Sequence, residues 1–342
     1  MEIDGRRRLG GRAVGVPVWA LLALVVMTGC NGGMLDPQSD RAETVVTLWW
    51  VMFGISAAVM ALVTVVLLWG LRRASRSDAP ARQGVLGRDR LFVFGGGIAL
   101  PVTVMVLLMA LTVWSGRAIT EAAEDDAVVV EVVGHQWWWE VRYPDHGVVT
   151  ANEIHIPSGE AVEVRLLSDD VIHSFWIPEL GGKIDLIPGR TNTLVIEANQ
   201  PGEYRGQCAE FCGLQHAKMR LLVVAEERED FDEWVAQMRE PAAALTPQED
   251  GVLFEGQQAF LGSACVYCHT IEGTNASGTL GPDLTHLASR RMLASNVIPN
   301  TRGHLAGWIL DPQAVKPGTQ MPPTQLNAEQ LEALLDYLGS LE

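Results

Sequence analysis

Long apolar runs dominate the first third of the chain. Residues 44–71 and 91–116 form runs of 28 and 26 residues without a charged side chain. A helix needs about 20 residues to cross the hydrocarbon core of a bilayer, so each run can span it with some tilt. The pattern predicts a transmembrane helical hairpin over residues 40–118.

A shorter apolar run, residues 16–27, follows a basic stretch at the N-terminus. It ends in Met27 and two small residues that precede Cys30. This order is typical of a bacterial secretory signal, here residues 1–29, whose cleavage leaves Cys30 as a lipidated N-terminus. Met27 is unusual three places before the cysteine, so a signal cut elsewhere or kept as an anchor stays open.

The loop between the two predicted spans is rich in arginine. It contains Arg72, Arg73, Arg76, Arg82, Arg88 and Arg90 against Asp78 and Asp89. Short loops with an excess of arginine stay on the cytoplasmic side, so everything after residue 116 is expected outside. We therefore expect a protein of the bacterial inner membrane with both termini on the periplasmic or extracellular side.

From residue 128 to about 225 the pattern changes to short runs of β-branched and aromatic residues divided by turn residues. The clearest predicted strands are residues 128–133, 161–167 and 193–198. Short strands at this spacing indicate an all-β sandwich of about 100 residues. We place this domain at residues 121–237.

A second exported domain is predicted after a linker rich in alanine and proline, residues 238–250. Thr246, Pro247 and Glu249 are typical of a helix start, with a capping threonine, a proline at the first helical position and a glutamate three after the cap. A final helix is expected from Asn327. Residues 251–342 thus predict an all-α domain.

Charge is divided unevenly along the chain. Residues 1–120 contain 12 Lys+Arg and 7 Asp+Glu, whereas residues 121–342 contain 13 and 34. An acidic exported part argues against nucleic acid as a partner, because phosphates repel it. A solvated acidic surface is the simpler interpretation, and a docking surface for a basic partner is the other.

The predicted sandwich contains a cluster of soft metal ligands. Cys208, Cys212, His216 and Met219 lie within twelve residues. Thiolate, imidazole and thioether together favour copper over hard cations, and zinc has little use for the thioether. His173 is the best candidate for a second imidazole. A Cys208–Cys212 disulfide beside an incidental histidine and methionine stays open from spacing alone.

The last domain contains a haem-attachment pattern, in which Cys265 and Cys268 are followed directly by His269. In this pattern two thiols add to the haem vinyl groups and the histidine binds the iron. A disulfide or half of a zinc site is the alternative.

Four residues are candidates for the sixth iron ligand. Met321 is preferred because it lies in a proline-rich loop, residues 316–323, just before the final helix, and a methionine ligand raises the haem potential. Met292 is expected in a helical stretch as a core residue. His286 and His304 remain as further candidates.

Four motifs in order resemble the dinuclear copper-A domain of cytochrome c oxidase subunit II. They are residues 134–139, 170–176, 183–190 and 208–219. The resemblance extends over about residues 40–225 and implies a cupredoxin-like Greek-key sandwich behind two membrane helices. The last domain is similar to class I cytochromes c.

The resemblance implies a role for each copper ligand. By the resemblance, two coppers are bridged by Cys208 and Cys212. Each copper is capped by one histidine, His173 or His216. The weak axial ligands are Met219 and the backbone carbonyl of Glu210. A quinol-oxidising relative would not need these ligands, so their presence indicates a cytochrome as donor.

Three further residues matter by the same resemblance. The Glu210 side chain is implied to reach a magnesium or manganese ion shared with the catalytic subunit, and Trp137 is implied to lie on the electron-entry path. Many family members have a glutamate in the second membrane helix, seven residues before a proline. Counting back from Pro101 gives Phe94, so this chain lacks that acid for proton entry.

The function implied is that of subunit II of a respiratory haem–copper cytochrome c oxidase. Electrons would pass from haem c to copper A and on to another subunit that reduces oxygen to water, since both metals of this chain would be coordinatively filled. Expected partners are oxidase subunit I, subunit III, membrane lipid and an external donor, either a cytochrome c or a respiratory complex.

Three other functions are considered: the copper-A subunit of a nitric oxide reductase, a membrane-tethered electron carrier, and a copper-delivery or sensor protein. Two spans and a lipid anchor exceed what tethering needs and favour permanent docking to a larger membrane subunit. Two sites suited to rapid electron flow make little sense in a chaperone that must release copper.

Overall fold

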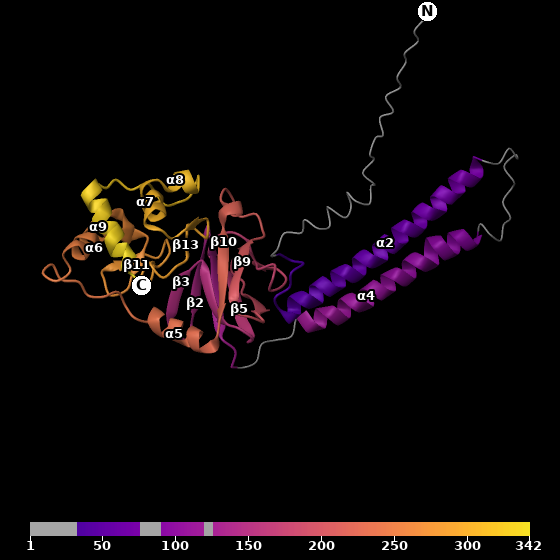
Figure 1. Cartoon of the computed structure of the whole chain (residues 1–342), viewed down its shortest axis with the longest axis horizontal. Coiled ribbons are helices and arrows are strands. Elements are labelled where there is room, and N and C mark those ends of the chain that lie inside the picture. Colours follow the sequence, from indigo (N-terminus) through magenta and orange to yellow (C-terminus); the bar gives the residue numbers. More distant parts are fainter. Residues whose placement is uncertain (1–32, 76–89, 120–125) are drawn as a thin grey trace, which may run out of the picture.

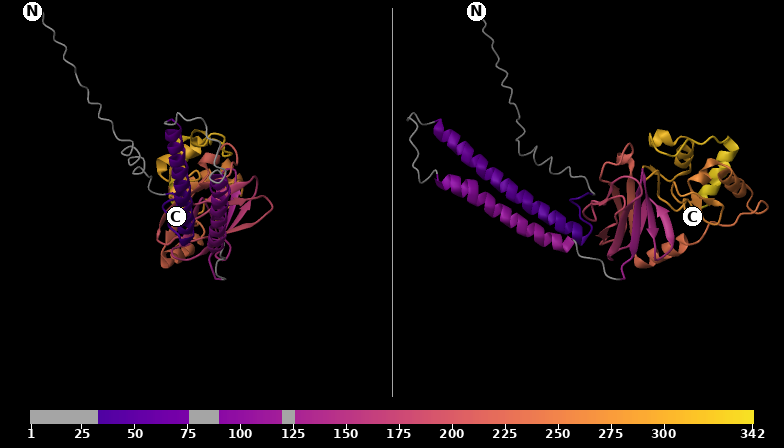
Figure 2. Two further views of the ribbon diagram at one scale, coloured as in Figure 1. Left: turned by 90° about the vertical axis from the view of Figure 1, so that its right-hand side faces the viewer. Right: turned by 180° about the vertical axis from the view of Figure 1, so that it is seen from behind.

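The computed structural model describes residues 33–75, 90–119 and 126–342. The predicted signal, Cys30 and most of the arginine-rich loop lie outside the described residues. Three parts follow one another in space: a helical hairpin, a β-sandwich and a C-terminal helical domain (Figure 1). The hairpin and the C-terminal domain lie at opposite ends of the sandwich, as the right-hand view of Figure 2 also shows.

The hairpin confirms the two predicted spans. Helix α2 (Asp40–Ala74) is 35 residues long, and the second span runs from Leu91 through α4 (Leu100–Ile119). Both helices are long and apolar enough to cross a bilayer, and no residue in the most apolar 18-residue stretch of either helix is buried. Such an extent of exposed apolar surface is unusual for a soluble domain and suits contact with lipid or another membrane subunit.

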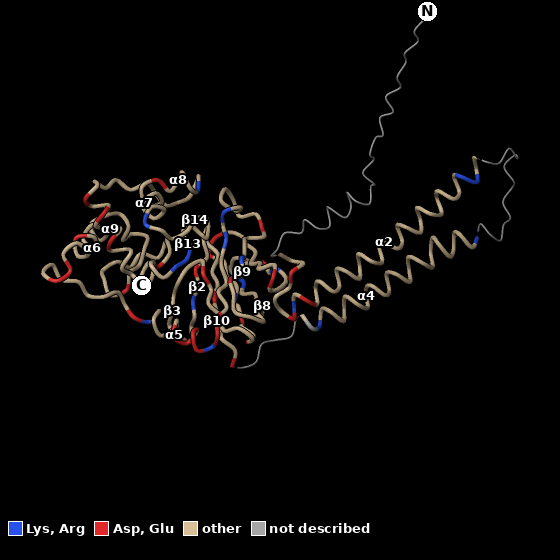
Figure 3. Tube along the Cα trace, viewed as in Figure 1, with Lys and Arg blue, Asp and Glu red and all other residues tan. Residues whose placement is uncertain are grey.

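The base of α2 is tied to the sandwich, whereas its far end is basic. Ser39 caps the helix, because its Oγ accepts from Ala42 N at 3.0 Å and donates to Leu180 O at 2.7 Å. Arg72 and Arg73 lie in the last turn, at the end away from the sandwich (Figure 3). The basic end of the hairpin and the sandwich therefore lie at opposite ends of α2.

The second span does not begin as the regular α-helix that the apolar run predicts. Its first nine residues form the π-helical segment η1 (Leu91–Ala99), in which the Leu100 N–H donates to Gly95 O. Three consecutive glycines, residues 95–97, lie in this segment, and their conformational freedom allows the backbone to adopt the wider turn of a π-helix. Phe94 is exposed on η1.

The sandwich consists of two five-stranded sheets. The first has the order β3-β2-β1-β5-β8. Its strands are β1 (Val129–His135), β2 (Trp138–Tyr143), β3 (Val148–Ala151), β5 (Val162–Ser168) and β8 (Asn192–Ile196). The second has the order β4-β10-β9-β6-β7. Its strands are β4 (Glu153–Pro157), β6 (His173–Trp176), β7 (Ile184–Leu186), β9 (Gly202–Cys208) and β10 (Arg220–Glu226).

The three predicted strands are confirmed as β1, β5 and β8, and each predicted end lies within two residues of the observed end. The alternation of β5 shows why: Val162, Val164 and Leu166 are fully buried, and Glu163 and Arg165 between them point outward. Both sheets contain parallel and antiparallel pairs. In the first, β1 is antiparallel to β2 and parallel to β5; in the second, β10 is antiparallel to β9 and parallel to β4. The inner faces of both sheets share one core, which helix α5 (Arg228–Met238) extends.

The C-terminal domain is mainly helical. Its helices are α6 (Gly251–Leu261), α7 (Arg302–Leu310), α8 (Pro312–Val315) and α9 (Ala328–Gly339), with a short 3-10 turn, η3 (Ala264–Tyr267). Two hairpins of two-residue strands join them: β11 (Thr270–Ile271) with β12 (Ala276–Ser277), and β13 (Met292–Leu293) with β14 (Ile298–Pro299). Helices α6 and α9 cross so closely that a Cβ on Gly256 would lie 2.0 Å from Ala333 O.

Two helix starts test the capping predictions. The final helix starts at Asn327 as expected, and Asn327 caps α9 in a full capping box with Gln330. The predicted start at Thr246 and Pro247 is wrong as a helix boundary, because α6 begins only at Gly251, although the Thr246 hydroxyl accepts from Glu249 N–H at 3.4 Å as a cap would. The Thr246 N–H donates to the Asp250 carboxylate at 2.6 Å, which closes a separate turn before the helix.

The C-terminal domain packs directly on the sandwich. The buried Glu153 carboxylate accepts hydrogen bonds from the backbone N–H groups of Arg291 (2.9 Å) and Met292 (3.0 Å). Asn296 Nδ2 donates to Asn152 O at 2.9 Å, and both side chains are buried. The contact therefore includes buried polar groups that are satisfied only across the two domains.

Candidate metal and haem sites

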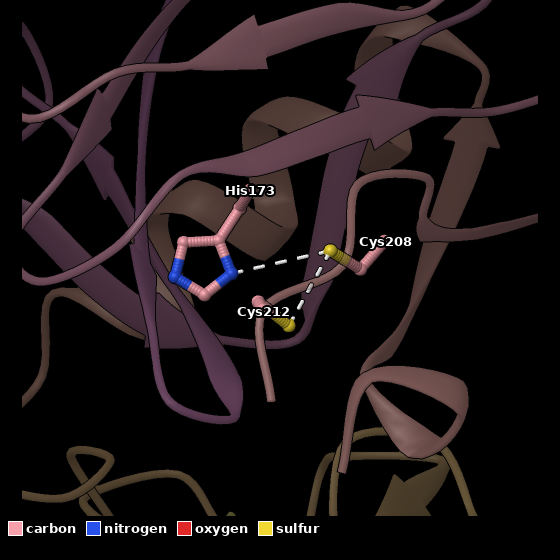
Figure 4. Close-up of side chains that lie close together, drawn as sticks. All are labelled: His173, Cys208 and Cys212. Carbon is pink, nitrogen blue, oxygen red and sulfur yellow. Dashed lines mark hydrogen bonds between the residues drawn. The ribbon is translucent and has the colours of Figure 1, made fainter. Parts of the chain in front are cut away.

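Two thiols meet at the edge of the sandwich that faces the C-terminal domain. Cys208 ends β9 and Cys212 lies in the loop that follows, and both are buried. Their sulfurs are 3.8 Å apart, far beyond the about 2.05 Å of an S–S bond, and both cysteines are free. The disulfide interpretation is therefore wrong for this structure (Figure 4).

His173 joins this pair from a distant part of the chain, at the start of β6. Its Nδ1 lies 3.9 Å from Cys208 Sγ, while its Nε2 makes a 2.8 Å hydrogen bond with Asp170 Oδ1. The carboxylate orients the ring so that the other nitrogen faces the thiols, the usual arrangement behind a metal-bound histidine. The ring also needs Gly134, because a Cβ there would lie 2.7 Å from His173 Cδ2.

The remaining predicted copper ligands surround the same two sulfurs. His216, which begins the short turn η2 (His216–Lys218), places Nδ1 3.8 Å from Cys212 Sγ. Met219 Sδ lies 3.8 Å from the same sulfur, and Glu210 O lies 3.2 Å from Cys208 Sγ. The structure thus brings all six residues of the predicted set together, and the Glu210 side chain remains exposed.

The electrostatics of the thiol pair fit bound cations. The hydrogen bond from the Cys212 thiol lowers the pKa of Cys208. The same hydrogen bond raises the pKa of Cys212, because this thiol must keep its proton to donate, and burial and repulsion from the Cys208 thiolate 3.8 Å away raise it further. Metal ions shared by the two sulfurs would remove this conflict, and a set of two thiolates, two imidazoles and a thioether suits copper.

Trp137 lies against this site from the loop between β1 and β2. Its Nε1 donates to Cys212 O at 2.9 Å, and Gln136 Nε2 donates to the same carbonyl at 2.7 Å. Trp137 is only 9% exposed, because the C-terminal domain covers it. The contribution of Gln136 could not be predicted from the sequence, since nothing in its local pattern indicates a contact 76 residues away.

The C-terminal domain contains a cavity of about 420 Å³, hereafter the C-terminal cavity. The predicted haem-binding residues Cys265, Cys268, His269 and Met321 all line it. Trp137 of the sandwich also lines it, so the cavity opens toward the thiol site. Its apolar walls and volume suit a flat aromatic cofactor.

His269 is held for iron binding through one nitrogen. Its Nδ1 forms a 2.7 Å hydrogen bond with Pro282 O, which leaves Nε2 as the available ligand atom. Burial lowers the pKa of His269, which favours the neutral ring that a metal requires. Gly281 permits this packing, because a Cβ there would lie 2.8 Å from His269 Cε1.

The structure narrows the choice of the sixth ligand. Met321 and Met292 both line the C-terminal cavity, whereas His286 and His304 are not among its lining residues. His286 binds Glu342 O, and His304 binds the Thr301 hydroxyl. The helical expectation for Met292 is wrong, because it lies on strand β13, held there by the contacts that its hairpin makes with the sandwich.

Two buried cations fit the acidic groups of a haem. Lys316 and Arg290 line the C-terminal cavity and are 2% and 8% exposed. Arg290 Nε has no hydrogen-bond partner among the described residues. A haem has two carboxylates, so the donor set matches this cofactor in charge as well as in shape. The sequence signal is faint: Lys316 lies in a loop that also contains glycine and proline, and Arg290 is one of two adjacent arginines in another loop.

Hydrogen bonds join the C-terminal cavity to the thiol site. Lys316 Nζ donates to Trp137 O at 2.8 Å, and Gln320 Nε2 donates to Gln136 O at 3.1 Å. Both donors lie in the loop that contains Met321. Since Gln136 and Trp137 also donate to a carbonyl of the thiol site, the two sites are linked by contiguous contacts across the domain boundary.

Comparison with protein families gives two matches along the chain. Residues 147–226 match the family of the periplasmic domain of cytochrome c oxidase subunit II. Residues 254–342 match the cytochrome c family. The first match covers the thiol site and the second covers the C-terminal cavity.

Related proteins extend the likeness to nearly the whole chain. Cytochrome c oxidase subunit 2 of Alkalihalophilus pseudofirmus is 34% identical over 92% of this chain and 94% of its own length. The same subunit of Bacillus sp. (strain PS3) is 33% identical over 71% of this chain and 72% of its own length. The crystal structure of the periplasmic domain of subunit II of the Bradyrhizobium japonicum oxidase is 31% identical, covering 35% of this chain and 96% of that one, with a TM-score of 0.33. The chain therefore belongs to the cytochrome c oxidase subunit II family, in a form with a cytochrome c domain at its C-terminal end.

Proposed function

We propose that this chain is the electron-entry subunit of a bacterial respiratory oxidase that reduces oxygen to water. The observation that carries the proposal is the contact between its two candidate redox sites. The loop with Met321 hydrogen-bonds to Gln136 and Trp137, which in turn donate to Cys212 O. When bound, haem c and copper A would supply one-electron redox chemistry, and this chain would hold both centres so that electrons from an outside donor could reach the catalytic subunit.

We assign the copper-A ligands as the resemblance implies. Their support is the convergence of the ligand atoms of His173, Cys208 and Cys212 within 4.8 Å of one another, with the other three residues around them. The assigned roles are two bridging cysteines, two capping histidines and two axial ligands: Cys208 and Cys212, His173 and His216, Met219 and the carbonyl of Glu210.

For the haem, Cys265 and Cys268 provide the covalent attachment, His269 the proximal ligand and Met321 the sixth ligand. Met321 is preferred over Met292 because its loop is stiffened by prolines and held by Gln313, whose Nε2 donates to Met321 O at 3.3 Å. A methionine ligand raises the haem potential.

The protein contributes rigidity to electron transfer. His173 and Met219 are fully buried, and both belong to or adjoin strands of the second sheet. A ligand set held by two packed sheets changes little between oxidation states, which suits fast transfer at small driving force. Trp137 fills the space between the C-terminal cavity and Cys212, so we place it on the transfer path.

The catalytic subunit is proposed to dock beside α2. A cavity of about 540 Å³ lies between the base of α2 and the thiol site, lined among others by Ala42, Lys183, Ala209 and His216. The exposed Glu210 carboxylate is available to a magnesium or manganese ion shared with that subunit. Subunit III and a soluble or complex-bound cytochrome donor complete the proposed partners.

We further propose that the chain lies in the inner membrane with both redox domains outside. The contact of α2 with the sandwich through Ser39 supports one fixed orientation. The proposed segments are a signal (residues 1–29) with lipidation at Cys30, the membrane hairpin (40–118) and the copper-A domain (121–237). A linker (238–250) and the cytochrome c domain (251–342) follow.

The order of reduction tests this function. A basic soluble cytochrome c, reduced beforehand and mixed rapidly with the oxidised complex, should reduce haem c first and copper A after it. Spectra of the two centres followed in one stopped-flow experiment give the order directly. Copper A reduced ahead of haem c would contradict the proposed route.

A further inference from the structure

Lys316 carries its ammonium into the contact between the two domains. The side chain is 2% exposed, and Nζ donates to Trp137 O at 2.8 Å and to Ser295 Oγ at 3.1 Å. Both acceptors are uncharged. Within the described part of the chain no carboxylate forms an ion pair with this ammonium.

The protein alone does not favour a cation at this place. Burial lowers the pKa of Lys316 to about 7, and the nearby Lys218 adds repulsion. A buried ammonium is expensive unless an anion compensates its charge. Since an ammonium has three N–H donors and two are used here, one donor remains for a further acceptor.

Lys316 also lines the C-terminal cavity, together with His269 and Met321. The cofactor proposed for this cavity carries carboxylates, which are the anions that the unused donor requires. A carboxylate on the ammonium would restore the usual pKa of Lys316 and compensate its charge. A cofactor carboxylate would thus compensate the charge of the buried ammonium, and the ammonium would bind that carboxylate.

We propose that Lys316 binds a carboxylate of the attached haem and joins it, through the same ammonium, to the Trp137 carbonyl. The inference rests on the proposed function, because it requires a haem in the C-terminal cavity. Lys316 is then a positioning residue that ties the cofactor to the segment beside Cys212. Its positive charge also stabilises the reduced haem, which has one positive charge fewer than the oxidised form.

The test measures the haem c reduction potential in the full-length oxidase by spectroelectrochemistry. Lys316→Met keeps most of the length of the side chain and removes its ammonium. It should make reduction of the haem about tenfold less favourable, a fall of about 59 mV for one electron. Lys316→Arg keeps the charge and should keep most of the potential.

Lys218→Met is the matched control. Lys218 lies in the same interface, where Nζ donates to Val315 O at 2.5 Å, but it is not among the residues that line the C-terminal cavity. Its removal takes away an equal charge without touching the haem carboxylate. The haem potential should therefore change much less than in Lys316→Met.

A second measurement reports the carboxylate itself. Haem labelled with ¹³C at its carboxylates gives isotope-shifted bands in the redox difference infrared spectrum, and their frequencies depend on hydrogen bonding. These bands should move in Lys316→Met and stay in place in Lys218→Met. If Lys316→Met does not accumulate, Lys316→Arg provides the test, because a guanidinium binds a carboxylate differently and should also move the bands.

The inference is wrong if Lys316→Met retains its haem with an unchanged potential and unchanged labelled bands. Unchanged labelled bands in Lys316→Arg contradict it as well. A different failure concerns the proposed function: an unmodified protein that carries no covalent haem would overturn that proposal, independently of Lys316.

Discussion

Glu153 is the residue of the sandwich on which docking of the cytochrome domain should depend most. Its Oε1 accepts the backbone N–H groups of Arg291 and Met292, and the side chain is 3% exposed. Glu153→Ala would leave two backbone donors without a partner at a domain boundary. Glu153→Gln keeps the accepting oxygen and serves as the control.

The magnitude follows from the cost of an unpaired donor. An orphaned buried N–H costs about 1–3 kcal/mol, and two at a partly buried contact should cost about 2–3 kcal/mol in total. At about 1.4 kcal/mol per factor of ten, the population of undocked molecules should rise about 30- to 150-fold. Glu153→Gln should change it by much less.

Hydrogen exchange of the full-length protein measures this population. The loop of residues 313–321 touches the sandwich without touching Glu153, so faster exchange there reports undocking of the domain as a whole. We expect acceleration by the factor above in Glu153→Ala, with copper and haem spectra unchanged. Faster exchange confined to residues 291–292 would refute the reasoning, since it would mean that the contact matters only locally.

Three further predictions concern the redox sites. Cys208→Ser or Cys212→Ser should abolish the near-infrared copper absorption and leave the haem spectrum intact, and a single copper in the unmodified protein would contradict the dinuclear assignment. Met321→Ala should remove the sulfur-to-iron band of the oxidised haem and lower its potential while the haem stays attached; the same effect from Met292→Ala instead would show the axial assignment to be wrong. Deleting residues 245–342 should retain copper A but sharply reduce oxidase activity with a membrane-bound donor, because a short linker keeps the attached haem near the copper at an effective concentration in the millimolar range. The deletion uncovers Trp137, so high concentrations of a basic soluble cytochrome c should partly restore activity, and less so at high salt. Rescue that does not depend on salt would argue against docking of this cytochrome on an acidic surface.

Much of the fold could be predicted because its signals are local. An uncharged run of 28 residues has few alternatives to a span, and the alternation of Val162, Val164 and Leu166 has few alternatives to a strand with one buried face. Helix boundaries were less predictable. Thr246 makes the hydrogen bonds of a cap, since its hydroxyl accepts from Glu249 N–H and its own N–H donates to the Asp250 carboxylate, but these bonds close one turn and α6 begins only at Gly251.

The candidate sites divide in the same way. Cys208, Cys212, His216 and Met219 lie on one loop, so their proximity followed from covalent connection, as it did for Cys265, Cys268 and His269. His173 is 35 residues from Cys208, and only the pairing of β6 with β9 places it there. The sequence made it the best candidate for a second imidazole, and its role as a copper ligand was implied by the family resemblance.

By itself the sequence determined the two spans, the strand-rich domain, the two cysteine motifs and the kind of metal chemistry that they support. Only the tertiary structure decided how the two redox domains meet. Glu153 and Lys316 look like ordinary surface charges in the sequence, yet both are buried in the domain contact, where each binds backbone atoms of the other domain. The reason is physical: periodicity encodes which face of an element is buried, whereas the contact between domains depends on surfaces assembled from segments far apart in the chain.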